Sequence, residues 1–305
     1  MIASVSIRNV QCLRRLEVPL RPLTVLVGNN DTGKSTFLRA LWHLSTGTAP
    51  TRSFGAEPRQ ALVLEAALGG DRFPIAIGAA PPIPYRRVLV TQLPANGVQL
   101  VGQGFYDNQG VPELGANGSN VPALLDHFFR HDEPRWKDFK NALKAQVPGV
   151  QDVQIATPDP STRRVDLVIE NGQRMPADQA STGVRALIFY LALAYHPTPA
   201  PLILIEEPET GLHPKRLEDV MRLLRAIAEG QHGSPAQVVL STHSPYLLDC
   251  VDLEKDQVLV FRRLPDGTRT AEPADTARLK VFLDEFKLGE VWFNRGEDGL
   301  VKEGV

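Results

Sequence analysis

Apolar residues are spaced along this chain in two different ways, one typical of strands and one typical of helices. Over residues 2–20 and 23–27 the apolar residues come in short runs with strand-like spacing, which predicts two antiparallel strands and then a third. From residue 34 to residue 44 the spacing becomes helical, with Phe37, Leu38, Leu41 and Leu44 on one side. The first part of the chain is therefore predicted to form strands, a loop at residues 28–36 and a helix.

The same two kinds of spacing continue to the end of the chain. Strand-like runs predict strands at residues 62–67, 73–77, 87–92, 97–101, 152–156, 165–170, 202–205, 237–241 and 256–263. Helical spacing predicts helices at residues 121–129, 134–146, 184–195 and 214–229, and a loop rich in Gly and Asn is expected at residues 108–120. Strands and helices alternate from residue 184 onward, which predicts a parallel sheet covered by helices. The tail is expected to finish this sheet with a strand and a helix; a dock for a separate effector is the alternative.

The composition is that of an ordinary globular protein. The chain has 305 residues, of which 43% are hydrophobic and 22% charged, and its net charge of -2 argues against a strongly basic nucleic-acid module. Cys12 and Cys250 lack metal-type spacing, so reduced thiols are expected, with a disulfide as the alternative. No apolar run approaches the length of a membrane span, and the first residues resemble a strand rather than a signal peptide. We expect a cytoplasmic protein without a membrane partner.

The loop at residues 28–36 has the pattern G-x-x-x-x-G-K-[ST] between a strand and a helix. A triphosphate needs many donors at close range, and glycines let the backbone N–H groups approach it. The helix that follows directs its positive end at the same anion. Lys34 is predicted to reach the β- and γ-phosphates of ATP, and Ser35 to hold Mg²⁺. The predicted nucleotide-binding residues of this loop are Gly28, Asn29, Asn30, Asp31, Thr32, Gly33, Lys34, Ser35 and Thr36.

Two acids follow the apolar run at residues 202–205. Since the end of a strand in an α/β sheet faces the ligand crevice, Glu206 is predicted to reach the Mg²⁺ shell and Glu207 to accept a proton from the attacking water. His243 follows another apolar strand and is predicted to hydrogen-bond the γ-phosphate or that water. A solvated acidic turn and a structural histidine are the alternatives, and the order of the motifs favours catalytic roles.

A second helix start has residues that suit an anion. Ser181 precedes the most apolar helix and is expected to cap it, and Gly183 would allow close approach to the helix N-terminus. A plain N-cap explains the same residues equally well.

Taken in order, these motifs resemble an ABC-type ATPase head. The resemblance rests on residues 28–36, 181–185, 202–209, 211–214 and 241–245, and within that class it is strongest to ATPases related to RecF, to the chromosome-maintenance heads and to the overcoming-lysogenisation-defect (OLD) nucleases. It implies a Walker A loop at residues 28–36, Walker B acids at Glu206 and Glu207, a D-loop at residues 211–214 and a switch histidine at His243. It also implies that Ser181 and Gly183 form a signature segment that completes the site of the opposite subunit, and that Gln92 is the Q-loop glutamine near the metal.

The resemblance also implies a fold, that of a P-loop NTPase of the ABC-ATPase type. This α/β fold has a mixed central sheet with helices on its faces, an antiparallel β subdomain and a helical lobe. We expect one domain of two lobes, with a nucleotide-binding core at residues 1–53 and 178–262, an inserted lobe at residues 54–177 and a C-terminal extension at residues 263–305. The chain departs from the pattern where Glu206 replaces the aspartate of transporters and where the signature has Ser-Thr-Gly instead of Ser-Gly-Gly. No coiled coil interrupts the chain, and no nuclease domain is expected after residue 245.

Two functions agree with these motifs. The first is a Mg²⁺-dependent ATPase head that forms a homodimer around two ATP molecules and gates a DNA-related or defence-related partner. The second is a nucleotide-gated regulatory or scaffold subunit with little turnover, acting through a separately encoded effector. Basic pairs, which include Arg14 with Arg15, Arg86 with Arg87, and Arg163 with Arg164, could contact DNA, but a solvated charged surface explains each pair more simply.

Overall fold

The computed structural model describes residues 1–46, 63–68, 71–74, 88–104, 110–283 and 285–301. The chain divides into two units. The first consists of residues 1–90, 201–207 and 236–305, and the second of residues 91–200 and 208–235. The predicted loop at residues 28–36 and the predicted acids therefore belong to the first unit, and the predicted signature segment belongs to the second.

A six-stranded mixed sheet forms the centre of the first unit, in the order β14-β13-β3-β12-β11-β6. Its strands are β3 (Leu23–Val27), β6 (Val88–Thr91), β11 (Leu202–Glu206), β12 (Gln237–Thr242), β13 (Gln257–Arg263) and β14 (Arg269–Pro273). Strands β11, β12, β3 and β13 run parallel, whereas β14 is antiparallel to β13. Every residue of β3 and β12 is buried, as in the inner strands of a parallel sheet, and the polar residues buried with the apolar ones are Thr24, Gln237, Ser241 and Thr242. Because these strands are parallel, β3, β11 and β12 all end at the same edge of the sheet.

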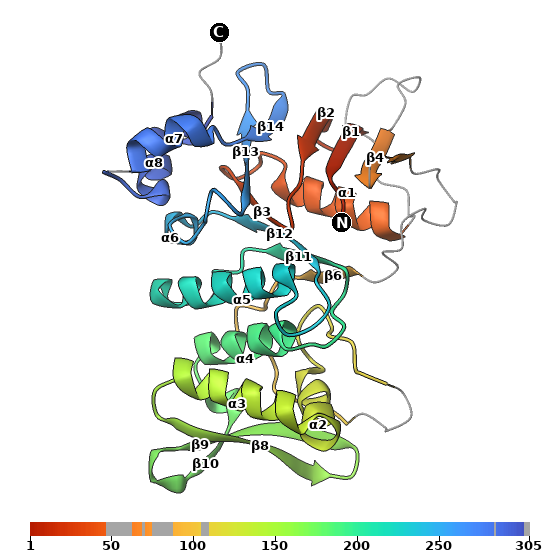
Figure 1. The fold of residues 1–305 in the computed structure, drawn as a ribbon, viewed down its shortest axis with the longest axis vertical. Helices are drawn as coiled ribbons and strands as arrows, with labels where there is room; N and C mark the ends of the chain where they lie inside the picture. The colour runs from red at the N-terminus through yellow and green to blue at the C-terminus, as the bar shows by residue number, and fades with distance from the viewer. Residues whose placement is uncertain (47–62, 69–70, 75–87, 105–109, 284, 302–305) are drawn as a thin grey trace. The chain divides into compact units, whose positions relative to one another are not determined.

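A second, antiparallel sheet lies beside α1 (Lys34–Thr46) in the same unit, in the order β2-β1-β4-β5 (Figure 1). Its strands are β1 (Ser4–Val10), β2 (Leu13–Pro19), β4 (Val63–Leu68) and β5 (Asp71–Pro74). Helix α1 contacts strands of both sheets. The apolar side predicted for this helix is fully buried there, and Phe37 meets Phe261 edge to face, with ring centroids 5.6 Å apart. This packing fixes the helix start next to the end of β3.

The C-terminal part of the first unit adds strands β13 and β14 and three helices (Figure 1). The helices are α6 (Pro245–Leu248), α7 (Thr276–Leu283) and α8 (Leu288–Arg295), followed by the 3-10 helix η4 (Glu297–Gly299). A Cβ atom at Gly289 would overlap the carbonyl oxygen of Pro245, so α8 approaches α6 closely because a glycine stands there. The predicted strand and helix at the end of the sheet are therefore present.

In the second unit, helices α5, α4 and α3 follow one another in a stack above a small antiparallel sheet (Figure 1). The helices are α2 (Val121–His131), α3 (Glu133–Gln146), α4 (Thr182–Ala194) and α5 (Leu217–Glu229), with 3-10 helices η1 (Glu170–Gly172), η2 (Ala177–Gln179) and η3 (Pro214–Arg216). The strands are β7 (Val101–Gln103), β8 (Val150–Asp159), β9 (Thr162–Ile169) and β10 (Arg174–Pro176). Residues 186–194 of α4 are all buried because α3 and α5 pack on it. Even so, no helix in the described part of the chain is both long and apolar enough to cross a bilayer.

One predicted strand is wrong over most of its length. Residues 97–100 are not in a strand, and β7 begins only at Val101. The reason is that side chains take the backbone groups of this segment. Arg185 donates to the carbonyl oxygens of Asn96 and Val98 at 2.6 and 2.8 Å, and Asp178 accepts the N–H of Leu100 at 2.6 Å. Of the other predicted strands, residues 62, 75–77 and 87 lie outside the described residues.

Candidate active site

The loop that follows β3 depends on two glycines. Gly28 has φ +151° and Gly33 has φ +104°, values that side chains rarely allow. A Cβ atom at Gly28 would also overlap the carbonyl oxygen of Phe261, and one at Gly33 would lie 2.9 Å from Cδ2 of Leu13. The loop therefore packs tightly against its neighbours and delivers the chain directly to the start of α1.

A cavity of about 360 Å³ lies at this loop, at the edge where β3, β11 and β12 end. It is lined by Cys12, residues 30–36, Glu207, Ser241 and His243. The structure thus brings the predicted Walker A loop, one of the two predicted Walker B acids and the predicted switch histidine together, although they are far apart in sequence. The shared cleft that an ATP site requires is present, and the individual roles of these residues remain predictions.

Lys34 is bent back onto the loop that it follows. Its side chain is nearly buried, and its Nζ donates to the carbonyl oxygens of Gly28 and Asn29 at 2.7 and 2.8 Å. A second contact secures the helix start, where the hydroxyl of Thr36 donates to the Gln11 side chain at 3.1 Å. The ammonium group is therefore already held at the loop, where terminal phosphates would approach a Walker A motif.

The two acids after β11 have different positions. Glu207 has φ +47°, in the left-handed region that a glutamate seldom occupies, and its N–H donates to the carbonyl oxygen of Ser241 at 3.0 Å. Such a conformation costs roughly 1–3 kcal/mol and is often found at functional sites. Glu206 is not among the described residues that line the cavity, but it pairs in register with Ser241, which does line it. Glu206 therefore lies at the cavity's edge.

His243 connects the acid to the lysine electrostatically. Its Nε2 lies 3.4 Å from Oε1 of Glu207. Burial and the charge of Lys34 lower the pKa of His243 below its ordinary value of 6.5, while Glu207 and a hydrogen bond with the Gly28 backbone oppose that shift. The imidazole is therefore mainly neutral at pH 7. Below pH 6.5 the unfolded chain takes up this proton first, so this group lowers stability as the pH falls.

These opposing charges give a test of the geometry. In the nucleotide-free protein, Lys34→Met is expected to raise the pKa of His243, because it removes a nearby positive charge, and Glu207→Gln is expected to lower it. The measurement is an NMR titration of the His243 ring protons in the parent protein and both variants. Shifts of the same sign in the two variants would contradict this arrangement.

The predicted signature segment and D-loop contact each other in the second unit. Ser181 caps α4 as predicted, because its hydroxyl accepts the N–H of Val184 at 3.4 Å. Thr182 donates to the carbonyl oxygen of Gly211 at 3.2 Å, and a Cβ atom at Gly183 would lie 3.6 Å from the same oxygen. Gln92, the predicted Q-loop residue, also belongs to this unit and is exposed directly after β6.

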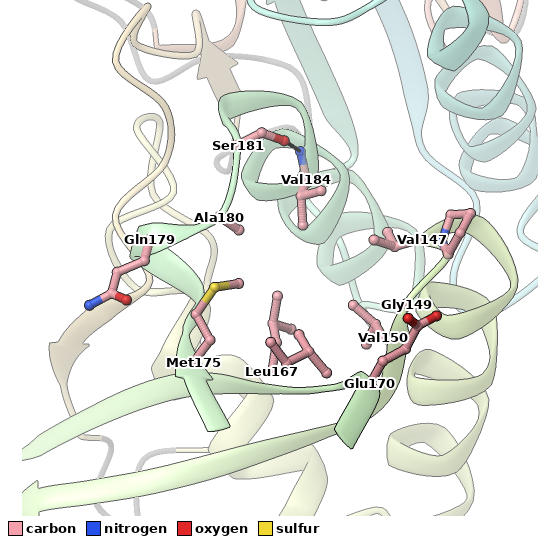
Figure 2. A pocket seen from close by; sticks show the side chains of 12 residues that line it. Val147, Gly149, Val150, Leu167, Glu170, Met175, Gln179, Ala180, Ser181 and Val184 are labelled. Atoms are coloured by element: carbon pink, nitrogen blue, oxygen red, sulfur yellow. Dashed lines mark hydrogen bonds between the residues drawn. The ribbon is translucent and has the colours of Figure 1, made fainter. Parts of the chain in front are cut away.

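A second cavity, of about 440 Å³, lies beside Ser181 in the second unit. Figure 2 shows Met175 and Leu167 projecting into it, with the Ser181 cap of α4 on the opposite side. Most of its lining is apolar, and its acidic residue is Glu170. The carboxylate repels a phosphate group, and the apolar lining would remove water from it without offering hydrogen-bond donors in return. This cavity therefore does not suit a nucleotide's phosphates.

Sequence reasoning missed several residues at the first cavity. Cys12 and Ser241 line it, and Arg269 and Glu297 bind its loop from the C-terminal segment. Ser241 is part of the motif at residues 241–245, but no role at the site was predicted for it. Neither Cys12 nor Cys250 takes part in a disulfide.

Acids neutralise the predicted basic pair Arg163 and Arg164 in the second unit, whereas Arg14 and Arg15 are exposed in the first unit. Arg163 pairs with the buried Asp126 at 2.9 Å, and Arg164 with Asp166 at 2.6 Å. The pair Arg86 and Arg87 lies outside the described residues. These ion pairs favour structural roles for both arginines of the second unit.

Comparison with known families identifies the domain. Residues 93–249 match the family model described as "AAA domain, putative AbiEii toxin, Type IV TA system", and this match covers more than half of the 305 residues. The chain belongs to this AAA family. A second model, described as "AAA ATPase domain", matches residues 1–68 of the AAA chain, which include the Walker A loop.

Curated relatives of the AAA chain fall into two kinds. The OLD nuclease of Thermus scotoductus is 22% identical over an alignment of 365 residues. This alignment covers 95% of this chain and 68% of the nuclease. An uncharacterized ABC transporter ATP-binding protein of Mycobacterium tuberculosis is 29% identical over 145 residues, 46% of this chain and 40% of that protein. The AAA chain thus spans less than half the length of the first relatives that it matches.

Solved structures show the same fold. The SmcHead bound to the C-winged helix domain of ScpA superposes with a TM-score of 0.58 at 15% identity, covering 91% of this chain and 99% of that one. The Smc head domain of Pyrococcus furiosus bound to the C-terminal domain of ScpA gives a TM-score of 0.53 at 12% identity, covering 93% and 98%. The predicted fold is therefore confirmed: the AAA chain is a P-loop NTPase with an ABC- and SMC-head-like mixed sheet and an antiparallel β subdomain. The chain thus contains an AAA ATPase domain, is similar in sequence to OLD nuclease and shares its fold with the SMC heads.

Proposed function

We propose that this AAA domain hydrolyses ATP with Mg²⁺ and that two copies close around two nucleotides. The observation that carries the proposal is the single cavity lined by the Walker A loop, Glu207 and His243. A phosphate-binding loop opposite a carboxylate and a neutral imidazole is the arrangement that attack of water on a terminal phosphate requires.

The oxygen ligands at the cavity suit a magnesium ion. Ser35 and Ser241 offer hydroxyl groups there, and Glu206, the register partner of Ser241, adds a carboxylate at the edge. Mg²⁺ prefers oxygen ligands and keeps several of its waters, so few protein ligands suffice. When bound, the ion would neutralise charge on the phosphates. Ser35 and Glu206 are the residues that we propose hold it, and Gln92 stays a predicted further ligand.

In this proposal Glu207 accepts the proton of the attacking water, and His243 lies beside it. The Lys34 ammonium group already lies at the loop, where it donates to two carbonyl oxygens. When a triphosphate binds, its oxygens can replace these carbonyl oxygens as the acceptors of the Lys34 hydrogen bonds. Glu207 then orients the attacking water and accepts its proton. The neutral His243 ring, 3.4 Å from Glu207, can bond the γ-phosphate or this water.

We propose that Ser181 and Gly183 of one copy complete the nucleotide site of the other. The capped N-terminus of α4 supports this role, since it offers N–H groups to an anion. The dimer would thus separate when ATP is consumed. A protein partner belongs to the same proposal, supported by the toxin–antitoxin description of the family and by the ScpA domains bound to the SMC heads.

Gly183→Ala separates the dimer role from folding. The added methyl group would make ordinary contacts at 3.6 and 3.9 Å with Gly211 and Leu212, so the variant is expected to fold and to melt no lower than the parent. At a closed dimer interface the same methyl group would crowd the nucleotide, and ATP-dependent dimerisation should weaken at least about tenfold. Light scattering with ATP and Mg²⁺ measures the mass, and thermal unfolding is the control. Unchanged dimerisation would contradict the trans role.

Steady-state turnover of ATP by the full chain tests the proposal as a whole. Mg²⁺-dependent release of phosphate, lost in Glu207→Gln, is the expected result. Tight ATP binding without turnover would instead favour the alternative of a regulatory or scaffold subunit that acts through a separate effector.

A further inference from the structure

The C-terminal segment of the first unit, residues 257–301, contacts the Walker A loop through side chains of β14 and η4. Arg269 of β14 donates from Nε to the carbonyl oxygen of Asp31 at 2.7 Å and from Nη2 to its Oδ2 at 2.5 Å. The Arg269 side chain is only 19% exposed. One guanidinium group thus holds both the backbone and the side chain of a single loop residue, a geometry that Lys could not reproduce.

Asp31 is the residue of the loop that most needs such support. It has φ +62°, and its carboxylate is 67% exposed at the cavity. A carboxylate beside a phosphate-binding site repels the triphosphate unless its charge is neutralised. Arg269 therefore serves the loop twice, by fixing its backbone and by neutralising its negative charge at closer range than Arg263, whose Nη1 lies 3.9 Å from Oδ2 of Asp31.

Other contacts show that Arg269 is not needed to attach the segment. Arg262 of β13 forms ion pairs with Glu272 of β14 and, at 2.6 Å, with Asp298 of η4, and β13 itself pairs with β3 of the central sheet. Glu297 of η4 accepts the N–H of Asn29 at 2.6 Å, so a second C-terminal residue also reaches the loop. Arg269 and Glu297 both lie outside the regions matched by the two family models.

We propose that Arg269 is a positioning residue of the nucleotide site, which holds Asp31 and neutralises it so that the loop accepts a triphosphate. The inference rests on the proposed function, because it presumes that this loop binds ATP. Arg269 touches no reacting atom, so its loss should affect nucleotide binding and leave the chemical step nearly intact.

The test is the Kd of the full chain for a fluorescent ATP analogue with Mg²⁺, together with kcat and KM. Arg269→Ala is expected to weaken binding about tenfold and to raise KM while kcat changes less than about twofold. Arg269→Lys keeps the charge but not both contacts and should recover part of the affinity. Arg295→Ala is the matched control, since it removes a C-terminal guanidinium that packs over the Phe282 ring, and it should bind like the parent.

A second background identifies the charge effect. In Asp31→Asn no carboxylate needs neutralising and only the bond to the backbone carbonyl can be lost, so adding Arg269→Ala should cost clearly less in Kd than the loss of about tenfold expected in the parent background. An equal cost in both backgrounds, or unchanged binding by Arg269→Ala, would overturn the inference. Should Arg269→Ala fail to fold, Arg269→Lys decides instead, and affinity equal to the parent would overturn it. A parent protein that binds no ATP refutes the proposed function itself, which is a different result.

Discussion

Replacing Glu207 with Gln is expected to lower kcat for ATP hydrolysis about a thousandfold and to leave ATP bound. The amide keeps the size of the side chain and can still touch the water, but it cannot accept its proton. The backbone of Glu207 is held by the bond to Ser241, so the substitution should not move the chain. Single-turnover hydrolysis and the retention of labelled ATP measure the two effects, and the trapped protein should be dimeric by light scattering.

The neighbouring acid supplies the control for this variant. Glu206→Gln leaves the proposed base in place and is expected to raise the Mg²⁺ concentration needed for half-maximal turnover. The two acids are adjacent in sequence but differ in the structure, because only Glu207 is among the described residues that line the cavity. Turnover by Glu207→Gln at the parent rate would refute the assignment of the base.

Replacing Lys34 with Ala is expected to weaken ATP binding by about a hundredfold or more. Hydrogen bonds that carry a full charge contribute roughly 1.5–3 kcal/mol each, and the predicted lysine makes them to two phosphates. Arg39 on the exposed side of the same helix is the matched control, and Arg39→Ala should bind ATP like the parent. Isothermal titration calorimetry measures both.

The variant also tests what Lys34 does before nucleotide binds. Its Nζ satisfies the carbonyl oxygens of Gly28 and Asn29, so Lys34→Ala is expected to lower stability by about 1 kcal/mol as well. Thermal unfolding separates this loss from the loss of affinity. Binding within threefold of the parent by a folded Lys34→Ala protein would remove the lysine from the site.

Sequence alone predicted the centre of the site because its parts have local signatures. β3, β11 and β12 contain apolar stretches at residues 25–27, 202–205 and 238–240, and each stretch is followed closely by residues with predicted roles at the site. The Walker A spacing fixes loop, lysine and helix within nine residues. The parallel order of the strands then brings their ends together without any further information.

What sequence could not predict are contacts between distant residues. The side chains of Arg185 and Asp178 occupy backbone groups at residues 96–100, so a strand-like run forms no strand there. Likewise, Asp31 and Arg269 are separated by 238 positions, and no local pattern indicates that they pair. Glu207 has a positive φ angle and lines the cavity, whereas Glu206 is not among the described residues that line it, and the sequence Glu-Glu-Pro-Glu does not reveal this difference.

The place of β3 in its sheet has a consequence for how the protein is made. This strand ends at residue 27, yet its neighbours on either side are β12 and β13, at residues 237–263. During synthesis the ribosome releases the amino-terminal strand long before either neighbour exists, so it must wait while most of the polypeptide emerges. A nascent chain that stops short of β12 and β13 leaves an apolar strand exposed on both edges, which makes the unfinished protein a natural client for chaperones.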